Sequence, residues 1–177
     1  MLDIPDFTNR HVLYDIVMGW TYAHFGMPEK IALWFKNNLE HGEQDMHYQN
    51  YETMVKAKAL FAEKRYADVL KFIEDIGSGK GLASSYFGIL EISALEAAAR
   101  LRLGDEMGAL IAMQKAYEMS AANVIDTPFV ELGVDMRDLA DAAKSLHGVP
   151  RLWMEKMRSK ASVYAKKMGA VAECCRG

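Results

Sequence analysis

A short segment near the N-terminus, Met18–Gly26 (MGWTYAHFG), contains a pattern that recurs twice more along the chain. In each copy a small residue stands seven positions before a short break between two helix-forming stretches. The three pairs of small residue and break are Gly19 and Gly26, Ala57 and Lys64, and Ala97 and Gly104. Breaks of only a few residues force consecutive helices to lie antiparallel. The pairs recur after 38 and then 40 residues, and such a period predicts a stack of repeated helical hairpins.

Mostly apolar or small residues also occupy matching positions downstream of each break. The first set is Ile31, Val69 and Ala109, the second is Phe35, Ile73 and Met113, and the third is Asn38, Ile76 and Ala116. These positions predict the face by which the second helix of each hairpin packs against its neighbours.

Helix-forming residues dominate the whole chain, and alternating β-branched runs are scarce. The four prolines stand where helices begin or turns fall, so none interrupts a helix. The expected helices span residues 9–25, 28–40, 44–63, 65–77, 82–103, 105–121, 128–146 and 150–173. The predicted fold is therefore all-α: a right-handed stack of antiparallel hairpins with about eight helices. Residues 1–149 form the repeats, and residues 150–177 form a C-terminal capping or linker helix.

Composition narrows the class of protein. A length of 177 residues with 51% hydrophobic content suits one domain with a core of its own. The formal net charge of −3 argues against tight nucleic-acid binding by the whole chain, although residues 144–176 carry eight basic side chains against two acidic ones. Adjacent Cys174 and Cys175 suit a reducing compartment. Without a long apolar stretch or a signal-like N-terminus, we expect a cytoplasmic protein that does not contact a membrane.

The repeat resembles the tetratricopeptide pattern, in which a small residue lets the two helices of a hairpin approach each other. Met18-Gly19-x-x-Tyr22 followed by Gly26 is similar to that family's Leu-Gly-x-x-Tyr motif. Ala97, Gly104-Asp105, Ala109 and Ala116 match its small-residue spacing. The middle unit departs from it with Val69 and Ile76, and both periods exceed the usual 34 residues, so we expect longer helices or wider loops.

A second resemblance covers most of the chain. The stretch Asn123–Gly133 (NVIDTPFVELG), after an Ala-rich helix, is similar to the end of the helical-repeat sensor region in MalT-like, LuxR-family transcriptional regulators. The segment 153–164 looks like the helix that leads from that region towards the DNA-binding module. The resemblance implies signal sensing, with DNA contacted only through a module that this chain lacks. We therefore expect the chain to be a fragment of a longer regulator.

No arrangement in the sequence points to a catalytic centre, a metal site or a cofactor. Gly77-Ser78-Gly79-Lys80-Gly81 superficially resembles a phosphate-binding loop, but a helix precedes it and no Ser or Thr follows the Lys. His41 and His47 are six residues apart, which places them on different sides of a helix. Both segments are interpreted as solvated linkers, and the protein is expected not to be an enzyme.

The concave groove of such a stack is the candidate site, because the first helix of each hairpin lines its inner wall. The inner-wall positions implied by the family are Ile16, Trp20, His24, Tyr51, Met54, Lys58, Phe61, Glu91 and Arg102. Aromatic faces beside scattered charges suit a small-molecule effector or a protein or peptide partner. Packing of Trp20 and Tyr51 against neighbouring helices is an equally simple interpretation.

Two functional hypotheses follow. The first is a non-catalytic sensor or protein-interaction segment of a LuxR-family regulator that binds an effector or partner in the groove. The alternative is a free-standing tetratricopeptide-like adaptor that scaffolds other proteins. Either one leaves self-association into a homo-oligomer open.

Overall fold

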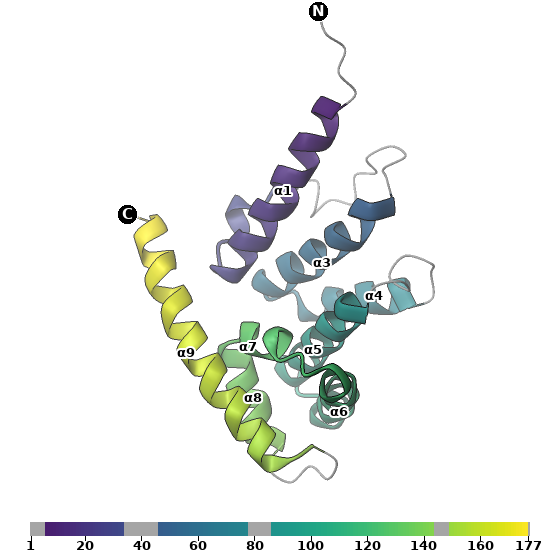
Figure 1. The fold of residues 1–177 in the computed structure, drawn as a ribbon, viewed down its shortest axis with the longest axis vertical. Helices are drawn as coiled ribbons and strands as arrows, with labels where there is room; N and C mark the ends of the chain where they lie inside the picture. The colour runs from purple at the N-terminus through teal and green to yellow at the C-terminus, as the bar shows by residue number, and fades with distance from the viewer. Residues whose placement is uncertain (1–5, 34–45, 78–85, 144–148, 177) are drawn as a thin grey trace, which may run out of the picture.

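All the regular secondary structure that the structure describes is helical, which confirms the all-α prediction. The computed structural model describes residues 6–33, 46–77, 86–143 and 149–176 (Figure 1). The elements in these ranges are α1 (Asp6–His24), the 3₁₀ helix η1 (Pro28–Lys30), α3 (Met46–Ala62), α4 (Tyr66–Gly77), α5 (Tyr86–Arg102), α6 (Glu106–Asn123), α7 (Thr127–Glu131), α8 (Val134–Ala142) and α9 (Arg151–Arg176). None of the described helices is long and apolar enough to cross a membrane.

Two of the predicted helices differ from the observed ones. The helix expected at 28–40 begins at Pro28 as predicted, but its first part is only the short η1, after which Ile31 is extended (φ −75°, ψ 135°). Residues 34–40 lie outside the described ranges, as do His41 and the 78–81 segment of the glycine-rich loop. The helix expected at 128–146 is divided into α7 and α8, because Gly133 adopts a left-handed φ of 56° that ends the first piece.

The three predicted breaks have the same backbone geometry. Gly26, Lys64 and Gly104 have φ values of 61°, 61° and 81°. At each one, its own N–H donates to the carbonyl three residues back, and the next N–H donates to the carbonyl five residues before it. This paired arrangement is the Schellman motif, which ends a helix through a residue in the left-handed region. The predicted turn positions are therefore confirmed, and they are equivalent in structure as well as in sequence.

The small residues of the repeat lie where helices pack closely. Gly19, Ala57 and Ala97 are all buried, on α1, α3 and α5 respectively. Helix α1 packs on α3, and α5 packs on α3, α4 and α6. Figure 1 shows α1 and α3 running side by side, with α4, α5 and α6 following in order. A larger side chain at these three positions would push the helices apart.

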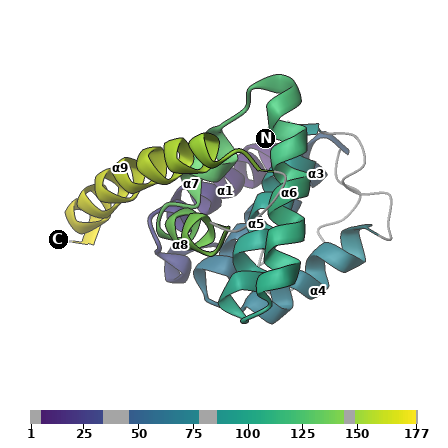
Figure 2. The ribbon, with the colours of Figure 1, turned by 90° about the horizontal axis from the view of Figure 1, so that it is seen from below.

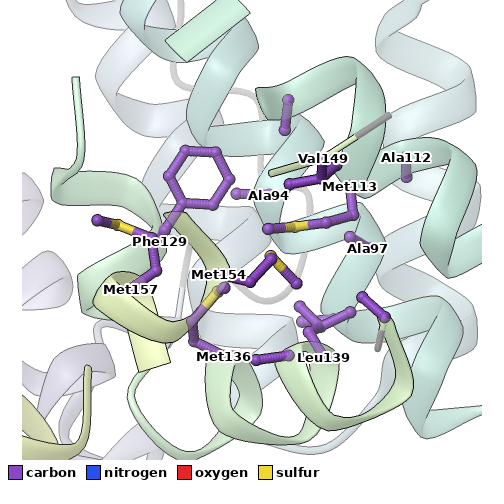
Figure 3. Close-up of a cluster of buried hydrophobic side chains, with 14 of the residues drawn as sticks. Ala94, Ala97, Ala112, Met113, Phe129, Met136, Leu139, Val149, Met154 and Met157 are labelled. Carbon is purple, nitrogen blue, oxygen red and sulfur yellow. The ribbon is translucent and has the colours of Figure 1, made fainter. Parts of the chain in front are cut away.

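The largest core is formed mainly by α5, α6, α7, α8 and the first half of α9 (Figure 3). Phe129, Met113, Met136, Leu139 and Met157 are completely buried in it. Alanines from α5 and α6 fill the remaining space, so these two helices approach closely. Burying one such large side chain stabilises a fold by roughly 1.5–3 kcal/mol, and these five residues together join α9 to the helices before it.

Helix α9 extends three residues beyond the predicted end and is attached along its first half. Met157 and Ala161 are buried, and the Trp153 ring packs edge-on against Phe129 and Tyr117. Two basic side chains of α9 also attach it to the start of α7, since Lys156 and Lys160 both pair with Asp126. The C-terminal end of α9 lies at one edge of the molecule (Figure 2), where Lys30 of η1 donates to the Cys175 carbonyl oxygen.

Candidate functional site

A cavity of about 390 Å³ opens between the C-terminal ends of α1 and α3, the middle of α5, the α7–α8 turn and the second half of α9. Its ionisable and charged lining residues are His24, Lys58, Lys64, Glu91, Glu131 and Asp135. Its larger apolar and aromatic lining residues are Phe25, Phe61, Tyr66, Leu95, Leu132, Tyr164 and Met168. Segments far apart in the sequence therefore share one pocket.

Lys58 of α3 joins two carboxylates from other helices. Its ammonium group forms ion pairs with Glu91 of α5 and, at 3.2 Å, with Glu131 of α7. The side chains of Lys58, Glu91 and Glu131 are only 11%, 9% and 14% exposed. Charges removed from water to this extent persist only where they are paired. The three residues therefore act as one buried charge cluster.

His24, the last residue of α1, completes this cluster. Its Nδ1 atom lies 2.8 Å from the Trp20 carbonyl oxygen, which can only accept, so we assign a proton to Nδ1. Its Nε2 atom lies 3.0 Å from Glu131 Oε2 and 3.2 Å from Lys58 Nζ. Nε2 thus faces both an acceptor and a donor. It has a partner whether or not it carries a proton.

Aromatic rings enclose the cluster. The Trp20 ring lies 3.9 Å from that of His24, and Lys58 Nζ lies 5.6 Å from the Trp20 ring centroid. Tyr164 of α9 presents its ring edge-on to His24 at 6.4 Å. These rings shield the charges from water and provide flat faces for a cation.

Two groups of the site have shifted pKa values that reflect this arrangement. Burial raises the pKa of Glu131, but the contact with His24 and the charge of Lys58 outweigh it, so the pKa lies below its ordinary value. Burial, together with the negative charge of Glu131, raises the pKa of Tyr164 to about 12. At neutral pH Glu131 is therefore a carboxylate and Tyr164 a neutral hydroxyl.

Arg102 and two aspartates form a second charged group beside the cavity. Arg102 Nε donates to Asp135 at 2.6 Å, and its Nη2 donates to Asp138 at 2.7 Å. Burial raises the pKa of Asp135 despite this partner. Asp135 lines the cavity. Arg102 does not line it, and its pairs with the two aspartates link α5 to α8.

Two glycine turns bring the walls of the cavity together. The Schellman turn at Gly26 ends α1 just after His24, so the imidazole stands at the helix terminus. A Cβ atom added at Gly133 would lie 3.4 Å from the Cβ of Ala165, and its φ of 56° is unfavourable for other residues. Gly133 therefore lets α9 approach the α7–α8 turn and close the cavity on that side.

The sequence-predicted groove residues are placed unevenly. His24, Lys58, Phe61 and Glu91 line the cavity, and Trp20 contacts two of them. They come from α1, α3 and α5.

The other four predicted positions do not line this cavity. Ile16 is buried between α1 and α3, where it packs in a small core that includes Val55. Met54 is buried in another core shared by α3, α4 and α5. Tyr51 is 64% exposed, and Arg102 is engaged with aspartates. Each helix turns its side chains through the full circle, so family spacing alone did not separate the cavity wall from the packed faces.

Glu131 and Tyr164 are central to the cavity, yet the sequence did not assign them a role. Glu131 belongs to the Asn123–Gly133 stretch, and Tyr164 is the last residue of the segment 153–164. An acidic residue within an otherwise apolar segment was the available signal for Glu131. Its partner His24 is 107 residues away, a contact that only the tertiary structure reveals.

The described residues that line the cavity offer charged, aromatic and aliphatic groups. Among the described residues that line the cavity there is no serine, threonine or cysteine, and Lys58 Nζ is paired with two carboxylates. Within the described ranges, no group of three or more His, Cys, Asp or Glu residues is placed to hold a metal ion. Comparison with family models, curated proteins and solved structures gave no match.

Proposed function

We propose that this chain is a non-catalytic sensor segment that binds a small effector in the cavity beside Lys58. The observation that carries the proposal is the cavity itself, which combines a buried charge cluster with aromatic and aliphatic walls. A volume of about 390 Å³ suits a compact metabolite. Buried polar groups fix a ligand's orientation, while the apolar walls supply most of its binding free energy.

The position of α9 supports a relay role. Its first half belongs to the main core through Met154, Met157 and Ala161, and its second half provides one wall of the cavity. A ligand that contacts this wall favours one position of α9 over others. In this proposal α9 passes the binding event to whatever follows it in the complete protein.

The wider assignment is to the helical-repeat region of a MalT-like, LuxR-family regulator with right-handed stacking of its hairpins. It is supported by the three equivalent Schellman turns and by the buried small residue that precedes each of them. Sequencing the reading frame around the encoding gene tests this context. A nucleotide-binding module upstream and a helix-turn-helix downstream favour the regulator, whereas a start codon at Met1 and a stop codon after Gly177 contradict it.

A thermal-shift screen with sugars, amino acids and nucleotides tests the binding role, because a ligand that prefers the folded state raises its melting temperature. The matched variants are Gly169→Leu and Gly77→Leu. A Cβ added at either glycine meets no atom within 4 Å, and both glycines lie in helices, so both variants should fold. Only Gly169 lines the cavity.

We expect a ligand's shift in the wild type and in Gly77→Leu, and its loss in Gly169→Leu. A ligand whose shift is unchanged by Gly169→Leu binds elsewhere and contradicts the cavity as the site. Reproducible turnover of a substrate by the purified protein would contradict the non-catalytic assignment.

An adaptor function remains the second candidate because α1 has an exposed apolar face. Leu13, Tyr14, Val17 and Trp20 lie at helical spacing, and all four are 39% or more exposed. A protein partner would bury this face. Val17→Lys should then abolish partner binding without changing ligand-induced thermal shifts, whereas Gly169→Leu should do the opposite.

A further inference from the structure

We infer that the effector is a small organic cation, an ammonium or guanidinium group carried on an apolar or aromatic body. This inference rests on the proposed function, since it names the class of ligand that the same cavity takes. It follows from the balance of charges in the cluster, the rings around it and the size of the space.

The buried cluster holds one more carboxylate than permanent cation. Lys58 is shared by Glu91 and Glu131, so a single positive charge serves two negative ones. The contacts of Glu131 with His24 Nε2 and with Lys58 Nζ both end on the same oxygen, Oε2. The low pKa of Glu131 means that its negative charge persists at neutral pH. A cationic ligand would balance this excess where water is scarce.

An anionic ligand meets the opposite situation. Its natural partner would be the ammonium group of Lys58, which is already engaged by two buried carboxylates. Pairing with the ligand would leave one of them without a cation, and an unpaired buried charge is strongly unfavourable. Such a ligand would also bring a third negative charge into the same space.

The other cations near the cavity do not reverse this preference. Lys64 lines the mouth but is exposed to solvent, where water and salt screen its charge. Arg102 is neutralised by Asp135 and Asp138. The excess negative charge therefore remains at the buried end of the cavity, beside Glu91 and Glu131.

The walls suit an organic cation better than a hydrated metal ion. Phe61, Tyr66 and Tyr164 line the cavity, and the faces of such rings attract cations at short range. Leu95 and Leu132 add aliphatic surface for an apolar body. A volume of about 390 Å³ is near the lower end of the range for ligand pockets and suits a molecule with about one ring.

Three probes of nearly equal shape isolate the charge: 2-phenylethylamine, the neutral 2-phenylethanol and the anionic 3-phenylpropionate. Isothermal titration calorimetry on the full chain at neutral pH should show the amine binding at least tenfold more tightly than either of the others. Glu131→Gln should weaken amine binding at least tenfold. Glu118→Gln, an exposed carboxylate on α6 that accepts a hydrogen bond from Gln114, is the matched control and should bind like the wild type.

The possible outcomes distinguish an error in the ligand class from an error in the proposed function. If the alcohol or the acid binds as tightly as the amine and Gly169→Leu abolishes that binding, the cation preference is wrong and the cavity remains the effector site. If no probe binds while a sugar or nucleotide does in the broader screen, the class is again wrong and the function stands. If no compound binds in either experiment, both the cation preference and the proposed effector-binding function are wrong. The three-probe comparison on the wild type decides the matter even if Glu131→Gln does not fold.

Discussion

At the scale of single residues, Lys58 has the most demanding position in the molecule. It lies between two carboxylates from α5 and α7, and all three side chains are almost removed from water. Replacing it by an apolar residue would leave both carboxylates without their cation. An uncompensated buried charge costs far more than a well-packed apolar replacement of the whole cluster would.

We therefore expect Lys58→Met to lower the free energy of unfolding by about 3 kcal/mol, the amount typical of a broken buried ion pair. Adding Glu91→Leu should recover part of this loss, because it removes one of the two stranded charges. Urea unfolding of the single and double variants measures both values. Equal stabilities for Lys58→Met and the wild type would mean that the ammonium is not buried between the two carboxylates.

Glu131 makes stability depend on pH. Its pKa in the folded protein lies below the ordinary value of 4.5, so its ionisation stabilises the fold. This contribution is complete above about pH 4.5 and is lost as the pH falls through the lowered pKa. The free energy of unfolding should therefore fall more steeply on acidification in the wild type than in Glu131→Gln.

Urea unfolding across this acidic range measures the two slopes. Asp135→Asn provides a control of opposite sign. Burial raises the pKa of Asp135, so its ionisation destabilises the fold as the pH rises above 3.8. Parallel profiles for the wild type and Glu131→Gln would contradict the described environment of this carboxylate.

At the scale of helices and turns, local chemistry made much of the structure predictable. The breaks at Gly26, Lys64 and Gly104 depend on hydrogen bonds within six residues, so a short sequence pattern was enough to locate them. The kink at Gly133 was not predicted, because a proline-led helical pattern continues on both sides of it. Gly133 also lies against Ala165, a contact between residues more than 30 positions apart that no local pattern contains.

The turns offer a pair of substitutions with opposite effects. Lys64 is a non-glycine residue with a φ of 61°, so Lys64→Gly should stabilise the protein by about 1 kcal/mol. Gly104 has a φ of 81° with no neighbour near a Cβ, so Gly104→Ala should destabilise it by about 1 kcal/mol through backbone strain alone. Thermal and urea unfolding of both variants test the pair. The same sign for both would show that the two turns are not equivalent.

At the scale of the whole molecule, the candidate site depends on contacts that no local pattern contains. His24 meets Glu131 across 107 residues, and Lys58 meets it across 73. The family resemblance placed His24, Lys58 and Glu91 on the first helices of successive hairpins, which is why they were predicted. It contained no information about how α7 and α9 fold back over those helices, and Glu131 and Tyr164 were missed for that reason.

Helix α9 has two separable roles, and two stop positions distinguish them. Met154, Met157 and Ala161 belong to the main core, whereas Tyr164, Ala165, Met168 and Gly169 line the cavity. A chain ending after Ala161 keeps the core residues and loses the cavity wall. We expect it to unfold cooperatively, with a near-native circular dichroism spectrum, but to bind no effector in calorimetry. A chain ending after Ala170 keeps both sets and should bind like the full chain.

A third truncation tests the predicted boundary at residue 149. A chain ending there loses three buried side chains from the main core, two of them methionines, and should be destabilised by several kcal/mol, since each large buried side chain contributes roughly 1.5–3 kcal/mol. If that chain were as stable as the full protein, residues 150–177 would be a separate linker helix. If the chain ending after Ala161 still bound the effector, α9 would not form a wall of the site, and the proposed relay through it would lose its physical basis.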